Sequence, residues 1–252
     1  MKITVYTVYY YYIKNILGEF IMSFLDVPMY PAALAGRFVK LSPGRVRRWL
    51  QGYEYAYEIG KDRTPCLRHK DPIVCREQPI ETSYASFLDL IDLLFVKQFL
   101  KYGLSLQRIR KALTEAQKLI GGHHFAQRTF FTNGRSIYIK VKEQGNAILE
   151  LLSGGQWVIA PIIEELSHQI EFDKPSGFAQ RWYPLGKKYP IVIDPAISFG
   201  QPSIIGRGIS TFNVYDFFIA ENEKIDSVTT WFKINKKEAG AAVEFERWLI
   251  AA

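Results

Sequence analysis

The strongest chemical signal in this 252-residue chain is a run of basic side chains between positions 37 and 48. Arg37, Lys40, Arg45, Arg47 and Arg48 lie in this run, and no acidic residue interrupts them. Guanidinium groups bind phosphate oxygens and the edges of guanine bases, so such a density of arginine is typical of a nucleic-acid contact. An ordinary solvated helix surface is the alternative, and the local lack of acids favours DNA.

One short helix is predicted to present three of these arginines. Ser42 suits the capping position before the first turn, and Pro43 suits the first helical position. Gly52 suits the left-handed residue that follows a last turn. The apolar side chains recur three and four residues apart, at Val46, Trp49 and Leu50. The pattern therefore predicts a helix over residues 42–52 with one buried side and one arginine-rich side.

The flanking segments complete a helix-turn-helix module with a wing. Residues 29–41 predict a first helix, and a short turn then leads into the arginine helix. Beyond Gly52, three tyrosines alternate with Glu54, Ala56 and Glu58, a strand-like period that indicates a β-hairpin. Basic residues of such a wing can meet phosphates. The candidate DNA-binding residues are Arg37, Lys40, Ser42, Arg45, Arg47, Arg48, Arg63 and Arg68.

Metal binding and catalysis have weaker support. Cys66, His69 and Cys75 are spaced as C-x2-H-x5-C, but a zinc site normally needs four ligands and no fourth lies nearby. Free thiols are the preferred interpretation. The sequence also lacks the G-x-S-x-G, phosphate-cradling and H-E-x-x-H motifs. We therefore expect no metal, no cofactor and no enzyme activity.

Composition sets the broad class of protein. Hydrophobic residues make up 48% of the chain, enough to bury real cores. The formal charge of +7 favours an anionic partner, although only mildly because 25 acids are spread among 32 bases. Two cysteines do not make a disulfide framework, so we expect a reducing compartment, the cytoplasm.

Two further helices are predicted after the wing, over residues 83–100 and 105–119, with Ser105 as the cap of the second. They are joined by the segment Gly-Leu-Ser-Leu-Gln-Arg-Ile-Arg-Lys-Ala-Leu at 103–113. A helix-turn-helix, a wing and such a helical pair resemble the MerR-type winged helix family. The resemblance covers residues 30–121 and implies a DNA-binding domain over residues 29–121.

The centre of the chain is less regular. Residues 122–172 predict a middle α/β segment, with a hairpin signal at Asn133-Gly134 and helical segments over 148–152 and 157–170. Residues 173–190 are rich in glycine, proline and aromatic side chains, and we expect them to form a linker.

The first 28 residues are a tyrosine-rich leader with two interpretations. In the preferred interpretation translation starts at Met22, and in the alternative the leader forms a genuine first strand or helix. No stretch reaches the ~20 uninterrupted apolar residues of a spanning helix, so we expect no membrane contact.

Residues 191–252 predict a β-hairpin followed by three short helices, the last with Glu244 and Glu246 exposed. Exposed acids there argue against insertion of that helix into a DNA groove. The ordered motifs are Ile193-Asp194-Pro195, Gly200-Gln201-Pro202, Gly206-Arg207-Gly208-Ile209 and Ala242-Val243-Glu244-Phe245-Glu246. They resemble the small C-terminal domain of unknown function found in VapB-type antitoxins.

The two resemblances together imply an antitoxin of a type II toxin-antitoxin system. Such a protein would bind the double-stranded DNA of its own promoter as a homodimer, repress its operon and neutralise a PIN-domain ribonuclease toxin. Ribonuclease sites of that class are acidic, so Arg181, Lys187 and Lys188 are candidates for toxin contacts.

A second function stays open on the sequence alone. The chain would then be an effector-responsive MerR-like transcriptional regulator without a toxin, and residues 123–170 would hold the small molecule. Under both functions we expect a mainly α fold with small β elements: an N-terminal winged helix-turn-helix and a C-terminal trihelical domain preceded by a β-hairpin.

Overall fold

The computed structural model describes residues 25–59, 64–74, 76, 83–120, 124–126, 164–166 and 168–251. The chain forms two compact units. Residues 28–168 with 247–252 make the N-terminal unit, and residues 169–246 with 1–27 make the C-terminal unit. The described elements are mostly helices with small two-stranded sheets, which confirms the mainly α fold class.

The N-terminal unit begins with a helical pair. Strand β1 (Tyr30–Pro31) pairs with β4 (Tyr84–Ala85) and leads directly into α2 (Ala32–Val39). Helix α3 (Pro43–Gln51) follows after three residues. The predicted first helix over 29–41 is therefore shorter, because Tyr30 and Pro31 pair as a strand and Lys40 leaves the helix in the left-handed conformation.

The turn between α2 and α3 depends on a glycine. Lys40 has φ = 56°, and the N–H of Leu41 donates to the carbonyl of Gly36 at 2.8 Å. A Cβ at Gly36 would lie 2.4 Å from the carbonyl oxygen of Leu41. Only a residue without a side chain lets the chain fold back this closely.

Helix α3 has the start and end that its sequence predicts. The Ser42 hydroxyl accepts from the N–H of Arg45 at 3.3 Å, and Pro43 fills the first helical position. Gly52 has φ = 77° after the last turn. The apolar side packs into the core, with at most 4% of each side chain exposed at Val46, Trp49 and Leu50.

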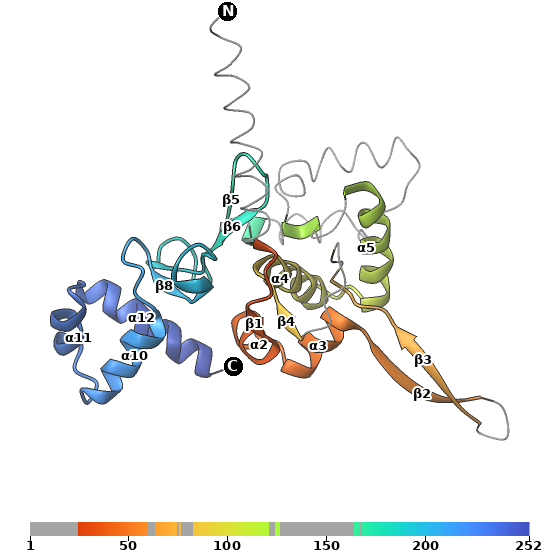
Figure 1. Ribbon diagram of the computed structural model, residues 1–252, viewed down its shortest axis with the longest axis horizontal. Coiled ribbons are helices and arrows are strands. Elements are labelled where there is room, and N and C mark those ends of the chain that lie inside the picture. Colours follow the sequence, from red (N-terminus) through yellow and green to blue (C-terminus); the bar gives the residue numbers. More distant parts are fainter. Residues whose placement is uncertain are drawn as a thin grey trace, which may run out of the picture. The chain divides into compact units, whose positions relative to one another are not determined.

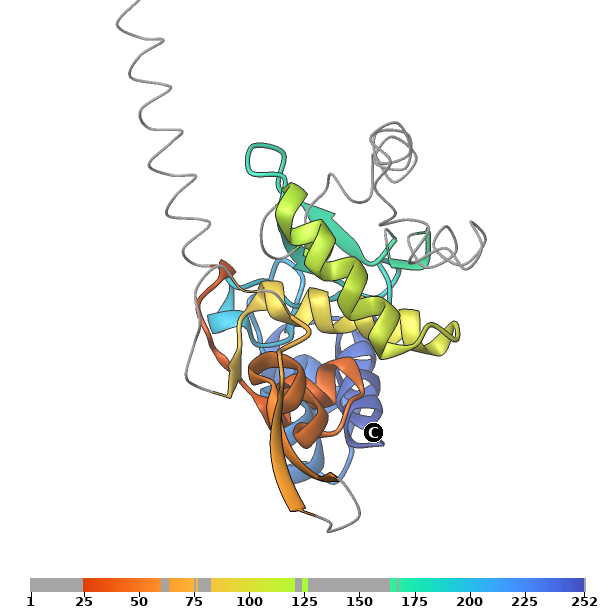
Figure 2. The same ribbon diagram turned by 90° about the vertical axis from the view of Figure 1, so that its right-hand side faces the viewer.

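A two-stranded ribbon leaves the end of α3 (Figure 1) and extends beyond the helical pair in the second view (Figure 2). Strands β2 (Tyr53–Ile59) and β3 (Thr64–Lys70) pair antiparallel, from Tyr53 opposite Lys70 to Ile59 opposite Thr64. The pairing confirms the predicted hairpin.

Two long helices support this arrangement. Helix α4 (Phe87–Lys101) starts with a capping box between Ser86 and Asp89, and α5 (Leu106–Ile120) starts with the Ser105 hydroxyl accepting from the N–H of Arg108. The short helix η1 (His124–Ala126) packs on both.

The N-terminal turn of α4 is tied to the chain that returns from the ribbon. Asp89 and Asp92 of α4 are both buried. Arg76 donates from Nη2 to Asp89 Oδ2 at 2.6 Å and to the carbonyl of Tyr84 at 2.7 Å. The Arg76 side chain therefore compensates the buried charge of Asp89.

Small hairpins and a helical trio make the C-terminal unit. Strand β5 (Ile170–Phe172) pairs with β6 (Ala179–Trp182), and β7 (Ile191–Val192) pairs with β8 (Ser203–Ile204) around the short helix η2 (Ser198–Gly200). Residues 173–190, expected to be a linker, carry β6 and belong to this unit. A bridge between Trp182 and Ile193 joins the two hairpins.

Three helices follow these hairpins: α10 (Thr211–Ala220), α11 (Ile225–Phe232) and α12 (Lys236–Ile250), of which α12 belongs to the C-terminal unit as far as residue 246. The expectation that Glu246 is exposed is wrong, because its side chain is 5% exposed and accepts from the Thr211 hydroxyl. Glu244 is exposed as expected. Helical periodicity did not reveal the burial of Glu246, because its partner lies on another helix.

Candidate nucleic-acid interface

Five of the candidate DNA-binding residues have exposed, charged side chains: Arg37, Arg45, Arg47, Arg48 and Arg68. Ser42 is exposed too, but its hydroxyl caps α3. Lys40 is half-buried, and burial lowers the pKa of its ammonium group, with Lys97 and Arg37 acting in the same direction. Arg63 lies outside the described residues. Lys40 is thus the least suited of these cations to a phosphate contact.

A cleft beside α3 gathers two of these arginines with cations from other elements. Arg45 and Arg48 line it from α3, Lys70 from the end of β3 and Arg110 from α5. The uncharged lining residues are Trp49, Tyr53, Leu106 and Gln107. Four positive charges and no carboxylate line this cleft, which we call the basic cleft. A site of this kind suits a phosphate group or another anion.

Backbone and side-chain bonds fix the walls of the basic cleft. The carbonyl of Trp49 accepts from the N–H groups of Ile73 and Val74, at 2.8 and 3.0 Å, so the chain after β3 returns to α3. Arg110 donates to the carbonyls of Asp71 and Pro72. The guanidinium of Arg110 therefore both lines the cleft and joins α5 to the base of the ribbon.

The sequence predicts phosphate contacts for Lys70, as a basic residue of the wing, but Arg110 is absent from the candidate DNA-binding set. Arg110 belongs to a basic face of the helix over 105–119, a pattern that usually means solvation. Only the fold brings it beside Arg48, because 62 positions of chain separate them in the sequence. Lys70 lies opposite Tyr53 at the base of the ribbon, which brings this wing cation to the cleft.

The net positive charge of the chain lies in the part of the sequence that contains this cleft. Residues 29–121 contain 16 lysines and arginines against nine acids, which equals the excess of +7 in the whole chain. Residues 169–246 contain nine basic and ten acidic residues. A polyanion would therefore be attracted to the N-terminal unit much more strongly than to the C-terminal unit.

The basic candidates for toxin contacts differ in their surroundings. Arg181 donates from Nε to Asp194 Oδ2 at 2.7 Å and from Nη1 to Glu171 Oε1 at 3.3 Å. The pKa of Arg181 is raised, chiefly by its hydrogen bond to Asp194. This network gives Arg181 a role inside the C-terminal unit. Lys187 and Lys188 are exposed after β6, and Lys187 Nζ lies 5.7 Å from the centre of the Tyr183 ring.

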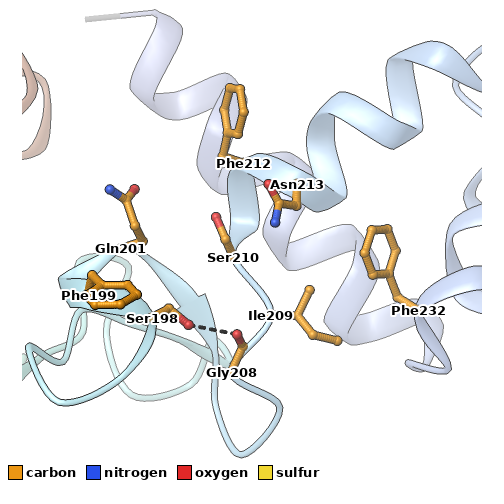
Figure 3. Close-up of a pocket in the computed structure, with 9 residues that line it drawn as sticks. All are labelled: Ser198, Phe199, Gln201, Gly208, Ile209, Ser210, Phe212, Asn213 and Phe232. Carbon is orange, nitrogen blue, oxygen red and sulfur yellow. Dashed lines mark hydrogen bonds between the residues drawn. The ribbon is translucent and has the colours of Figure 1, made fainter.

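The C-terminal unit has a hollow of different character (Figure 3). Its lining has no charged side chain and consists of Ser198, Phe199, Gln201, Gly208, Ile209, Ser210, Phe212, Asn213 and Phe232. Ser198 and Phe199 both have positive φ, and the Ser198 hydroxyl donates to the carbonyl of Gly208 at 2.7 Å. This hollow is neutral where the basic cleft is cationic.

A metal site is absent from the part of the chain that the structure describes, since no three His, Cys, Asp or Glu side chains gather there. Cys66 is half-buried with a free thiol, while Cys75 falls outside the described ranges. Among the described helices, none combines the length and the apolar character that crossing a membrane requires. Most of the middle segment over 122–172, with its predicted hairpin and helices, also lies outside the described residues.

The fold and the sequence both have counterparts in known proteins. The crystal structure of Rv2018 from Mycobacterium tuberculosis shares the fold, with a TM-score of 0.63 at 21% identity over 87% of this chain and 98% of that one. No family model matches the sequence.

Two curated proteins of the same organism, strain ATCC 25618 / H37Rv, are distantly similar in sequence. One carries the name "Putative antitoxin VapB45" and is 25% identical over 199 residues, which span 75% of this chain and 82% of that protein. The other is the uncharacterized protein Rv2308, 24% identical over 241 residues, or 90% and 93% of the two chains. The chain is thus a distant relative of a protein named as an antitoxin.

Proposed function

We propose that this protein is a DNA-binding antitoxin of a type II toxin-antitoxin system. In this role the N-terminal unit acts as a MerR-like winged helix-turn-helix domain, with α3 as the recognition helix and the β2–β3 ribbon as the wing. The observation that carries the proposal is the basic cleft, where four cations converge beside exposed arginines of α3. The distant similarity to VapB45 supports the antitoxin role.

DNA recognition in this proposal divides between two sets of side chains. Arg47 and Arg48 lie on the exposed side of α3, where a helix placed in the major groove contacts base edges. Cations of the basic cleft, such as Lys70 and Arg110, hold the phosphate backbone beside it. Two copies bound as a homodimer would place their α3 helices about one helical turn apart on the promoter.

The toxin in this proposal is a PIN-domain ribonuclease encoded beside the antitoxin. Its acidic active site would attract basic side chains of the C-terminal unit. Lys187 and Lys188 are the candidates with exposed charges, whereas Arg181 is held by Asp194 and Glu171. We therefore assign the toxin contact to Lys187 and Lys188, with Arg181 shaping the surface from which they extend.

One experiment tests both halves of this function. The full chain is co-expressed with the product of the adjacent open reading frame, and the complex is purified and footprinted on the shared promoter. We expect co-purification and a protected promoter segment. Lys187→Glu with Lys188→Glu should reduce co-purification and leave promoter protection intact. A chain that protects no promoter DNA and captures no neighbouring protein would contradict the proposal.

A further inference from the structure

The two faces of the β2–β3 ribbon differ in chemistry. Tyr53, Tyr55 and Tyr57 alternate along β2 and therefore share one face. The strand register adds Lys70 opposite Tyr53 and Arg68 opposite Tyr55 to the same face. We call this surface the tyrosine face. It combines aromatic rings with positive charge and, among the described side chains, holds no acid.

The opposite face carries the acids of the ribbon. Glu54 and Glu58 lie there, and His69 is opposite Glu54. Leu67 on this face leaves 71% of its side chain exposed. Because the acids of the described strands β2 and β3 share one face, a polyanion that contacts the ribbon is expected to lie on the tyrosine face.

The rings and guanidinium groups of the tyrosine face form a continuous row. The ring centroids of Tyr53 and Tyr55 are 6.0 Å apart, and those of Tyr55 and Tyr57 are 6.2 Å apart. The guanidinium carbon of Arg68 lies 4.4 Å from the centre of the Tyr57 ring, and that of Arg48 lies 5.7 Å from the Tyr53 ring. Planar groups therefore follow one another from α3 along the ribbon.

This row continues directly from the basic cleft, because Tyr53, Lys70 and Arg48 line the cleft as well. A strand whose phosphates bind in the cleft can therefore extend its next nucleotides along the rings. A cationic groove beside aromatic side chains is the combination that holds single-stranded nucleic acid in many proteins, since every base has a face that stacks.

Ring spacing favours unpaired over paired bases. Bases in a duplex stack ~3.4 Å apart and bury their faces against each other. The tyrosine rings are spaced at nearly twice that distance, so each ring matches a base that has left the stack. A duplex could meet the tyrosine hydroxyl groups but not the ring faces.

We propose that the tyrosine face is a binding site for the unpaired bases of single-stranded DNA, with its phosphates held by the basic cleft. This site shares the cations of the basic cleft with the proposed duplex contacts and adds the tyrosine rings, and it does not require promoter recognition. It would let the protein hold one strand of an opened duplex beside the ribbon.

The test measures the affinity of the full chain for a fluorescein-labelled oligothymidylate of about 12 nucleotides by fluorescence anisotropy at fixed salt. Tyr55→Leu removes the central ring and should weaken binding about 5-fold or more, because stacking of one base on one ring carries that much affinity. Tyr55→Phe keeps the ring and loses the hydroxyl, so it should bind within about 2-fold of the parent chain.

Leu67→Thr, on the opposite face, is the matched control and should leave oligothymidylate binding unchanged. Circular dichroism verifies that each variant is folded. Equal losses in Tyr55→Leu and Tyr55→Phe would overturn the proposal, because the hydroxyl would then be the contact. No loss in either variant would overturn it too. A parallel loss of promoter duplex binding in Tyr55→Leu would place these rings on duplex DNA instead. If the parent chain binds oligothymidylate but no promoter duplex, that result would count only against the recognition role of α3.

Discussion

The α2–α3 pair and the α11–α12 pair use the same backbone design in the two units. Each first helix ends on a lysine in the left-handed conformation, Lys40 with φ = 56° and Lys233 with φ = 53°. The next residue donates back to a carbonyl five positions earlier, at 2.8 Å from Leu41 and at 3.3 Å from Ile234. A three-residue turn then leads to a helix capped by a side chain, Ser42 in one pair and Asn235 in the other.

The two pairs differ in the charge of their second helix. In α3, Arg45, Arg47 and Arg48 are exposed, and two of them reach the basic cleft. The first turn of α12 also carries lysines, but Lys236 pairs with Asp226 at 2.7 Å. Glu238 in the same turn adds a carboxylate and pairs with Arg207 at 3.2 Å.

The comparison separates fold from function. One local backbone design serves a cationic surface in one unit and a nearly neutral surface in the other, so helix-turn-helix geometry alone does not define a DNA-binding site. The distinguishing feature is the convergence of unopposed cations from α3, the ribbon and α5. This is why we assign DNA binding to the N-terminal unit and partner contacts to the C-terminal unit.

The largest expected difference between the two pairs lies in their turns. Gly36→Ala would place a Cβ 2.4 Å from the Leu41 carbonyl oxygen, so the turn must shift. We expect a loss of about 1–3 kcal/mol in unfolding free energy, as for other overpacked sites. Hydrogen exchange should increase across residues 32–51. Thr229→Ala at the matching position of α11 removes atoms and should leave hydrogen exchange of residues 32–51 unaffected. Equal changes in the exchange of residues 32–51 in both variants would show that Gly36 has no special role in the turn.

The N-terminal caps of α3 and α12 are expected to differ less in their effect on stability. Asn235 and Glu238 cap α12 reciprocally, with N–H donors at 2.9 and 2.8 Å, whereas Ser42 makes one longer contact of 3.3 Å. Asn235→Ala should therefore cost about 1 kcal/mol and Ser42→Ala less than that. Thermal unfolding monitored by circular dichroism measures both. A larger loss in Ser42→Ala would mean that its hydroxyl has a further structural role.

The reciprocal cap formed by Asn235 and Glu238 also predicts the smallest effect, a pH dependence of the stability of the protein. The N–H of Asn235 lowers the pKa of Glu238 below its ordinary 4.5, and the guanidinium of Arg207 contributes. A lowered folded-state pKa stabilises the protein above pH 4.5, and this stability is lost as the pH falls through the folded value. Glu238→Gln should therefore melt below the parent chain at neutral pH, with the two melting temperatures converging under acid. A difference that stays constant with pH would exclude the ionised carboxylate as its source.

Local signals in the sequence were enough to predict α3, the β2–β3 hairpin and the start of α5. Ser42, Pro43 and Gly52 act within a few residues, and the alternating tyrosines report the strand directly. Features that depend on distant partners were missed: the burial of Glu246 against Thr211, the ion pairs of Arg181, and the hairpin within the expected linker. The basic cleft belongs to this second kind, because its cations come from three separate elements.

The most direct test of the central claim compares two pairs of cations on the two matched helices. Arg45→Ala with Arg48→Ala removes two charges from α3, and Lys236→Ala with Lys237→Ala removes two from α12. Affinity for the promoter duplex is measured by anisotropy over a series of salt concentrations, with the parent chain alongside. The double arginine variant should bind at least about 10-fold more weakly and lose about two units of salt slope, because each phosphate contact contributes about one. The double lysine variant should bind the promoter duplex within about 2-fold of the parent chain. Equal losses of affinity in both variants, or a larger loss in the lysine variant, would contradict the assignment of DNA binding to the N-terminal unit.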